Sequence, residues 1–407
     1  MKRYVLIVLL VLASTYGALF AFNAAVDPWD ISHREGLRKT RKDEDGRRVN
    51  IGFALAGAPR TLLLGNSRTQ EGFEGLSAPW GGDTLNGGLP GANAFELARA
   101  LALAARAPEL KCVVLALDFQ DYDAVNKIKG GFWLSPMSDG STSLAYIRTA
   151  GSRLTLQRSL ETLYDNATHG IGPILKPNIP RRAGEQRDWF HDTGRVAFEN
   201  YRASEYDPER VAFVAAAVDR LTANGVQVIG VFTPLHAWQS EALNRAGAGP
   251  RYLAWRRDVT TALSAFAGRK ASAPCVSGDA LTLHDFAGYQ APSVRPLPAL
   301  TEMQPDPNYH EASHFTPAVG STLLAALQKP DGDWGAVVTP ATLAQLDRDT
   351  AARRQAWLAA PAGQEATAFF DRLAVRKPGV ASVDRYYIGR EDWDRLRRSL
   401  SRPPKAR

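Results

Sequence analysis

Between residues 60 and 327, short apolar runs alternate with stretches of helical character, and this alternation constrains the fold more than any other feature. Lys111–Asp118 reads Lys-Cys-Val-Val-Leu-Ala-Leu-Asp, and Val226–Phe232 is similarly apolar. Strands without a polar face are typical of parallel sheets whose two faces are both covered by helices. The pattern therefore predicts an α/β fold, built on a parallel sheet with helices on both faces.

The bounds of the expected elements follow from the Gly, Pro and polar residues that end each run. The expected strands are Arg60–Gly65, Lys111–Asp118, Val226–Phe232 and Ala273–Ser277, and the expected helices are Ala92–Arg106, Asp207–Asn224, Arg251–Ala267 and Thr316–Leu327. The helix after Asp207 has a clear start, because an Asp cap, a Pro and an acid follow one another there.

The N-terminus carries an uncharged run, Tyr4–Phe22, directly after Lys2 and Arg3. The run is long enough to cross a bilayer as a helix and longer than the core of a typical signal peptide. We expect residues 1–25 to be an uncleaved signal anchor, although small residues near its end leave cleavage open. The basic pair favours a cytoplasmic N-terminus, despite further basic residues after position 33. The expected location is the inner (cytoplasmic) membrane, single pass, with the body in the periplasm.

Composition divides the rest of the chain into three parts, the second of which contains a long insertion. Residues 26–58 are polar and charged and are expected to form a stalk, and residues 59–330 form the α/β domain. Residues 122–206 interrupt the alternation and are rich in Gly, Pro, aromatic and basic residues. An insertion of this length favours a functional cap, with a packed surface subdomain as the alternative. Residues 331–407 are expected to form a helical appendage.

The net charge of +7 and the pI near 9.4 would suit an anionic partner. The basic residues are spread along the chain, however, without zinc-finger spacing, a basic zipper or interleaved aromatic and basic residues. Nucleic acid is therefore not an expected partner. The two cysteines, Cys112 and Cys275, lie in or beside apolar runs and are expected to be buried small hydrophobes, with a single disulfide left open.

A candidate nucleophile, Ser67, follows the first expected strand in the turn Gly65-Asn66-Ser67. In an open α/β sheet, ligands bind in the crevice beyond the carboxyl ends of the strands. A serine placed there can attack a bound substrate. The alternative is that Ser67 merely caps the following helix.

Three other segments supply the groups that acyl transfer needs. Asn86-Gly87-Gly88-Leu89-Pro90-Gly91 is a turn-dense stretch whose last glycine offers a backbone N–H to an oxyanion. The second expected strand ends at Asp118 and delivers Phe119-Gln120-Asp121 to the same edge of the sheet. Glu311 and His314 lie three residues apart in a short loop, so one loop can deliver a base and the carboxylate that orients it. No metal or cofactor is expected, because no pair of histidines has zinc-like spacing with a third ligand.

These motifs resemble those of the SGNH hydrolase superfamily, the GDSL-type esterases. Gly65-Asn66-Ser67-Arg68 is similar to the first block of that family, Asn86 with Gly91 to the second, and Glu311-Ala312-Ser313-His314 to the last. The chain looks most like the membrane-anchored, exported branch that includes alginate O-acetyltransferases and the teichoic-acid D-alanylation protein. The resemblance implies a flavodoxin-like sheet, with Ser67 and His314 as catalytic residues and Gly91 as an oxyanion glycine.

Two positions depart from the family pattern. Gln120 stands where the family has the asparagine of its third block, and could donate the same amide hydrogen bond. Glu311 replaces an aspartate, with Asp306 and Asp285 as alternative acids. Arg68, Asp118 and His236 are the candidate substrate-binding residues. For Arg68 a buried ion pair is the alternative, and for His236 an ordinary loop position.

The resemblance and the anchor together predict a serine acyl-esterase or O-acyltransferase, with O-acetyl as the expected group, that acts on a cell-envelope or extracellular polysaccharide. Acyl groups could come from a membrane-bound O-acyltransferase partner. The competing expectation is a catalytically degenerate protein that binds glycan or scaffolds an envelope assembly.

Overall fold

The computed structural model describes residues 1–32, 44–57, 59–170, 182–299, 302, 304–329 and 334–375. Parts of the expected stalk (33–43), of the expected cap (171–181) and of the expected appendage (376–407) lie outside these residues. Two structural units are present. Met1–Ala58 and Lys129–Pro177 form the first unit, and Pro59–Ile128 and Asn178–Arg407 form the second.

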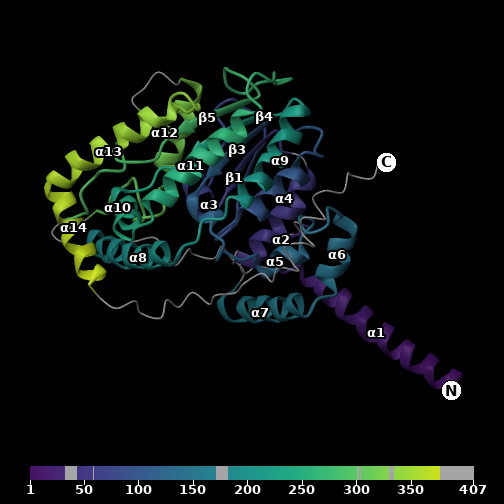
Figure 1. The fold of residues 1–407 in the computed structure, drawn as a ribbon. Coiled ribbons are helices and arrows are strands. Elements are labelled where there is room, and N and C mark those ends of the chain that lie inside the picture. Colours follow the sequence, from purple (N-terminus) through teal and green to yellow (C-terminus); the bar gives the residue numbers. More distant parts are fainter. Residues whose placement is uncertain are drawn as a thin grey trace. The chain divides into compact units, whose positions relative to one another are not determined.

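The second unit is built on a six-stranded, mostly parallel sheet with the order β2-β1-β3-β4-β5-β6. Figure 1 labels β1, β3, β4 and β5 of this sheet. The strands are β1 (Thr61–Gly65), β2 (Thr84–Gly88), β3 (Cys112–Leu117), β4 (Gln227–Phe232), β5 (Leu281–Asp285) and β6 (Ala336–Val337). All pairs are parallel except β5 with β6, which is antiparallel. Every residue of β1, β3 and β4 is buried. The predicted α/β fold with a largely parallel sheet is confirmed.

Helices cover both faces of this sheet. The helices of the unit are α3 (Ser67–Gly72), α4 (Ala94–Ala104), α8 (Ala183–Ala203), α9 (Glu209–Ala223), α10 (Ala237–Arg245), α11 (Gly249–Ser264), α12 (Pro317–Gln328), α13 (Leu343–Ala359) and α14 (Pro361–Ala374). The chain moves one way across the sheet from β1 to β2 and the other way from β2 to β3. Right-handed connections therefore place α3 and α4 on opposite faces. Accordingly, α3 packs against α12, whereas α4 packs against α9 and α9 against α11.

The strand order creates a switch point between β1 and β3, where consecutive connections leave to opposite faces. Ligand-binding crevices in open α/β sheets lie at the carboxyl ends of the strands at such a point. β1 ends at Gly65 and β3 at Leu117, so the segments that follow them, from Asn66 and from Asp118, start side by side at this edge.

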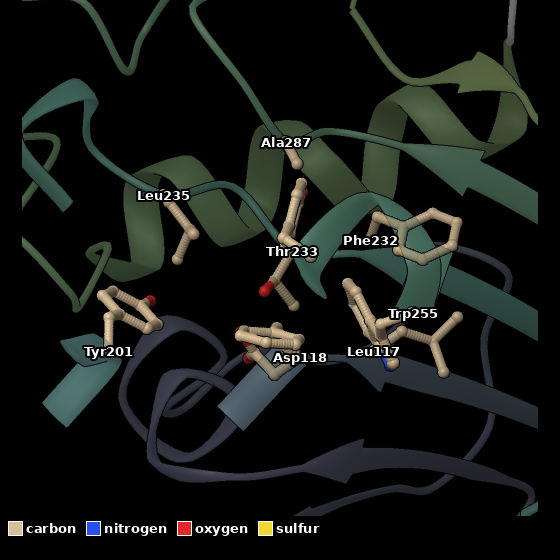
Figure 2. A pocket seen from close by; sticks show the side chains of 10 residues that line it. Leu117, Asp118, Tyr201, Phe232, Thr233, Leu235, Trp255 and Ala287 are labelled. Atoms are coloured by element: carbon tan, nitrogen blue, oxygen red, sulfur yellow. The ribbon is translucent and has the colours of Figure 1, made fainter. Parts of the chain in front are cut away.

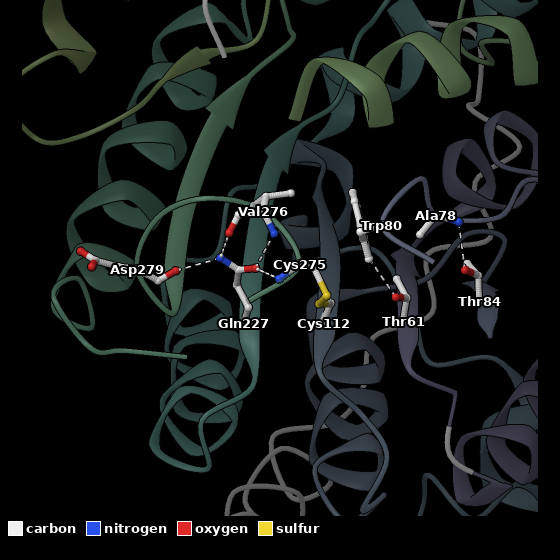
Figure 3. The surroundings of a disulfide bond; sticks show 9 residues. All are labelled: Thr61, Ala78, Trp80, Thr84, Cys112, Gln227, Cys275, Val276 and Asp279. Atoms are coloured by element: carbon white, nitrogen blue, oxygen red, sulfur yellow. Dashed lines mark hydrogen bonds between the residues drawn. A yellow bond between two sulfur atoms is a disulfide. The ribbon is translucent and has the colours of Figure 1, made fainter. Parts of the chain in front are cut away.

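The expected strand at Ala273–Ser277 is wrong, because this segment is a loop held from β4 (Figure 3). Gln227, the first residue of β4, accepts hydrogen bonds at Oε1 from the backbone N–H of Cys275 (2.8 Å) and Val276 (3.1 Å). Its Nε2 donates to the carbonyls of Val276 (3.0 Å) and Asp279 (3.1 Å). The backbone groups that would pair in a sheet are thus used by one side chain, and the strand forms later, as β5.

Cys112 and Cys275 form a disulfide across a Cα–Cα distance of 6.3 Å. Cys112 begins β3, so the bond ties the loop after α11 to the amino end of the sheet (Figure 3). The open alternative from the sequence, a single disulfide, is therefore what the structure shows. The bond lies at the end of the sheet opposite to Ser67.

The first unit consists of α1 (Lys2–Val26), α2 (Glu44–Ala54), α5 (Gly130–Leu134), α6 (Thr142–Ala150) and α7 (Arg153–His169). α1 packs against α6 and α7, and α2 packs against α5. α1 is long and apolar enough to cross a membrane. The expected insertion is thus divided: its first part groups with the N-terminal residues, while α8 belongs to the second unit.

Candidate active site

Ser67 is the first residue of α3, directly after the turn that ends β1. Asn66 caps this helix, because its side-chain Oδ1 accepts a hydrogen bond from the backbone N–H of Arg68 at 2.9 Å. The capping role that the sequence allowed for Ser67 belongs instead to Asn66. The Ser67 hydroxyl is therefore free to engage another group.

That group is the imidazole of His314, whose Nε2 lies 2.8 Å from Ser67 Oγ. The other ring nitrogen, Nδ1, contacts the Glu311 carboxylate. A carboxylate can only accept a hydrogen bond, so Nδ1 carries the proton and Nε2 accepts from the serine hydroxyl. The three side chains form a serine–histidine–acid array, with a base aligned on the nucleophile and an acid aligned on the base.

The loop that carries Glu311 and His314 is held from within. The Glu311 carboxylate accepts hydrogen bonds from the backbone N–H of Ser313 (2.7 Å) and His314 (3.0 Å). The backbone N–H of His310 donates to the carbonyl of His314 at 2.9 Å, which closes the loop. Glu311 is longer than the aspartate expected by resemblance. The loop accommodates it by bonding both carboxylate oxygens locally.

The same loop is packed onto α3 through Phe315, which is fully buried and packs edge-to-face on Phe73 with ring centroids 5.7 Å apart. A Cβ at Gly72 would overlap the Phe315 ring. Because residue 72 is a glycine, the Phe315 ring can pack against the end of α3, the helix that begins with Ser67. This packing fixes the position of the neighbouring His314.

Glu311 and His314 each shift the pKa of the other. Burial opposes the charged form of His314, but the charge and hydrogen bond of Glu311 outweigh burial and raise the pKa of His314 above its ordinary value. Burial likewise acts to raise the pKa of Glu311, but His314 and the backbone donor of Ser313 lower it overall. Glu311 thus stays ionised beside an imidazole of increased basicity.

Replacing Glu311 with glutamine should lower the pKa of His314 to below the unperturbed value of about 6.5. The substitution removes the charge that favours imidazolium while the burial that disfavours it remains. The pKa is measured by NMR titration of the imidazole C–H signals, with the His314 signal assigned by its loss in His314→Gln. An unchanged or higher pKa in Glu311→Gln would contradict the proposed pairing.

Arg68 and Asp118 form a buried ion pair beneath the array. Arg68 also donates from Nε to the carbonyl of Ser313 (3.0 Å) and from Nη2 to Ser313 Oγ (2.9 Å) and Gln120 Oε1 (3.4 Å). This guanidinium links the turn after β1, the end of β3 and the loop of His314. The structure therefore shows the buried pair that the sequence left as an alternative to substrate binding by Arg68, and Asp118 is its partner.

Asn66 and Asp121 extend this network, and sequence reasoning gave neither a role. Asn66 Nδ2 donates to Asp118 (3.0 Å) and Asp121 (2.9 Å). Burial and the neighbouring charge of Asp118 hold the pKa of Asp121 well above its usual range. The sequence signal for this network is the pair Asp118 and Asp121, three residues apart after β3. A tight turn there can direct both carboxylates at one group, here the Asn66 amide.

The two candidate oxyanion residues, Gly91 and Gln120, lie in the segments that follow β2 and β3. Gly65 pairs with Gly88 across β1 and β2, and Leu89 N–H donates to the Gly65 carbonyl at 2.8 Å. Gly91 follows in an exposed turn with φ of 59°, a left-handed conformation that favours glycine. Gln120, half-buried in a short 3₁₀ turn, accepts from Arg68 at Oε1 and so presents Nε2 as its donor end.

His236 is buried and has structural partners on both ring nitrogens. Nδ1 accepts from the backbone N–H of Trp238 at 3.3 Å, which caps α10, and Nε2 lies 3.1 Å from the carbonyl of Arg295. Burial lowers the pKa of His236 to about 3. The structure thus gives His236 the ordinary packed position that the sequence left as the alternative to substrate binding.

The two alternative acids are occupied elsewhere. Asp285 forms a buried ion pair with Arg256 at 2.8 Å. Asp306 lies 3.4 Å from Arg295 and caps the backbone N–H of Asn308 at 2.8 Å. Glu311 is therefore the acid that contacts His314.

A cavity of about 10 Å³ lies behind Asp118, at the carboxyl ends of β3 and β4 (Figure 2). Its lining is mainly aromatic and aliphatic, from Leu117, Asp118, Phe119, Tyr201, Phe232, Thr233, Leu235, Tyr252, Trp255 and Ala287. This volume holds about one water molecule. It is too small for an acyl chain, and neither Ser67 nor His314 lines it.

The chain was compared with family models, with curated proteins and with solved structures, and none of them matches it. The chemistry available to the site is therefore argued from its geometry.

Proposed function

We propose that this chain is an exported, membrane-anchored serine acyl-esterase or O-acyltransferase of SGNH-like type. The observation that carries the proposal is the 2.8 Å contact between Ser67 Oγ and His314 Nε2, with Glu311 on the opposite nitrogen. The β2-β1-β3-β4-β5 order is that of flavodoxin-like sheets, which supports the SGNH-like fold that the motifs imply.

The proposed reaction starts with attack of Ser67 Oγ on an acyl carbonyl, while His314 Nε2 takes the hydroxyl proton. Glu311 holds the imidazole in its tautomer and stabilises the imidazolium that forms. His314 then returns the proton to the leaving alcohol, and an acyl-serine remains. Water or a sugar hydroxyl, deprotonated by His314, attacks that ester, and His314 gives the proton to Ser67 Oγ as the ester bond breaks. Hydrolase and transferase differ only in which of these two acceptors enters.

The oxyanion of each tetrahedral intermediate would be held by the backbone N–H groups of Ser67 and Gly91, with Gln120 Nε2 as a further donor. Each such donor supplies about 3 kcal/mol of transition-state stabilisation. The buried Arg68–Asp118 pair serves these groups by holding the turn of Ser67 and the loop of His314 in register.

The proposed location is the inner membrane, with α1 as an uncleaved anchor and the body in the periplasm. Asn23, near the end of α1, is buried and donates to the Ala150 carbonyl at 2.8 Å, so the end of this helix is part of the folded first unit. Removal of α1 would leave that unit incomplete. The Cys112–Cys275 disulfide fits an oxidising compartment. An envelope polysaccharide as acyl acceptor or donor, and a membrane-bound O-acyltransferase as partner, belong to this proposal.

The proposal is tested by reaction of the full-length protein with a fluorophosphonate, followed by peptide mass spectrometry. Trypsin cleaves after Arg60 and Arg68, and the peptide Thr61–Arg68 contains Ser67 as its single serine. We expect the adduct on this peptide, while the peptide that contains the exposed Ser77 stays unmodified. An unmodified Thr61–Arg68 peptide in folded protein would instead favour the non-catalytic binding role.

A further inference from the structure

In the first unit, helix α7 buries small polar side chains and exposes large apolar ones. On α7, the buried positions are Thr155, Ser159 and Thr162, which are small and polar. Three of its large apolar side chains point outward, with Leu160 55%, Leu163 37% and Tyr164 67% exposed, whereas Leu154 and Leu156 are half-buried. In water an amphipathic helix buries its apolar stripe. Small polar contacts inside and apolar side chains outside are instead typical of helices that pack in lipid.

The buried face of α7 is satisfied by α1 and the residues that follow it. Ser159 Oγ donates to Asn23 Oδ1 at 3.0 Å, and Trp29 Nε1 donates to Thr155 Oγ1 at 2.8 Å. These hydrogen bonds fix which side of α7 faces inward. The outward direction of its apolar side chains is therefore set by the packing of the unit.

α6 repeats the arrangement. Its buried positions are the small residues Ala145, Thr149 and Ala150, whereas Leu144 is 59% and Ile147 50% exposed. We refer to the exposed apolar side chains of α6 and α7 as the apolar face of the first unit. They are Leu144, Ile147, Leu160, Leu163 and Tyr164.

The contacts between α1 and α6 indicate the level along α1 at which this apolar face lies. Tyr16 Oη lies 3.5 Å from the carbonyl of Ile147, and the rings of Phe20 and Tyr146 are 5.9 Å apart. Tyr16 lies before the end of the uncharged run at Phe22 by about 9 Å of helix rise. α6 therefore meets α1 at a level that is still within its apolar span. Interfacial helices lie about 5–10 Å into the boundary between headgroups and acyl chains.

We infer that α6 and α7 lie in the membrane interface beside α1, with the apolar face in contact with lipid. We assign the bilayer to this face because α6 and α7 pack beside α1. The apolar stretch of α1 that is long enough to cross a membrane is entirely exposed. The neighbouring basic residues Arg148 and Arg158 are paired with Asp139 and Glu161. Arg153, at the start of α7, is exposed, so a zwitterionic bilayer is used to test the apolar contribution alone. The inference rests on the proposed placement of α1 in a membrane and not on chemistry at Ser67.

The test places a fluorescent label on single cysteines in the full-length protein, reconstituted in phosphatidylcholine nanodiscs. The native cysteines are paired, so an introduced cysteine is the thiol that reacts. Leu160→Cys and Leu144→Cys carry an environment-sensitive probe, Leu9→Cys in α1 is the lipid-exposed control, and Lys270→Cys, with an 82% exposed side chain, is the control for water. Lipids with a shallow spin label and aqueous iodide are the two quenchers.

We expect the shallow spin-labelled lipid to quench the probes at positions 160 and 144 about twofold, as for an interfacial helix, with little effect of iodide. Quenching of these probes by iodide alone would overturn the inference, provided that position 9 is quenched by lipid. Protection from both quenchers would also overturn it, in favour of a protein partner or a second copy on this face. Loss of lipid quenching at position 9 would instead contradict the anchor itself. None of these outcomes depends on fluorophosphonate reaction at Ser67, so failure of the proposed chemistry remains distinguishable.

Discussion

Hydrolysis of an aryl acetate should fall by about 10⁶-fold when Ser67 is replaced by alanine or His314 by glutamine, to the residual rate that oxyanion donors alone provide. Ser67→Ala removes the atom that attacks the carbonyl. His314→Gln keeps a polar side chain of similar size but removes the imidazole nitrogen, 2.8 Å from the serine oxygen, that accepts its proton. Release of 4-nitrophenol from 4-nitrophenyl acetate measures both variants.

A double variant distinguishes a shared catalytic array from two independent effects. Residues that act as one unit are not additive, so Ser67→Ala with His314→Gln should be no slower than either single variant. Ser77→Ala, at an exposed position of the same segment, is the matched control and should keep the wild-type rate. Losses that multiply in the double variant, or an active His314→Gln protein, would contradict a shared catalytic array.

Arg68→Met should lower the free energy of unfolding by about 3–5 kcal/mol, because the substitution leaves the Asp118 carboxylate buried without its partner. The side chains of Arg68 and Asp118 are 2% and 4% exposed, so bulk solvent does not reach the unpaired carboxylate. The loss is measured by urea unfolding of the detergent-solubilised protein, followed by tryptophan fluorescence.

Removal of both charges should be tolerated better than removal of one. Arg68→Met with Asp118→Leu is expected to be less destabilised than Arg68→Met alone, since no unpaired charge remains. Arg269→Met is the surface control, because its ion pair with Asp219 at 2.7 Å is 37% and 49% exposed and contributes at most about 1 kcal/mol. Equal effects of Arg68→Met and Arg269→Met would show that the buried network does not hold the turn of Ser67.

The sequence carried most of the information for the central strands and little for the edges of the sheet. β1, β3 and β4 are buried on both faces and so appear as apolar runs. β2 contains Asn86-Gly87-Gly88, which we interpreted as a turn. It is a strand because it pairs in parallel with β1, and glycine at position 87 leaves room for Leu62, whose Cδ1 would lie 2.8 Å from a Cβ there. That requirement comes from a partner strand and has no local signal.

The same distinction holds at the site. The contact of Glu311 with His314 follows from a spacing of three residues in one loop, and spacing is visible in a sequence. Arg68 and Asp118 meet only because β1 and β3 are neighbours in the sheet. For such a pair the sequence supplies candidate charges, and the strand order decides which of them meet.

The Cys112–Cys275 bond has a consequence for the biogenesis of the protein. It closes a sequence separation of 163 residues, which includes α8, α9 and β4. With two cysteines in the whole chain, only one intramolecular pairing exists. If the body lies in the proposed periplasmic location, formation of this bond needs a thiol oxidant, but no isomerase is needed to correct an intramolecular mispairing.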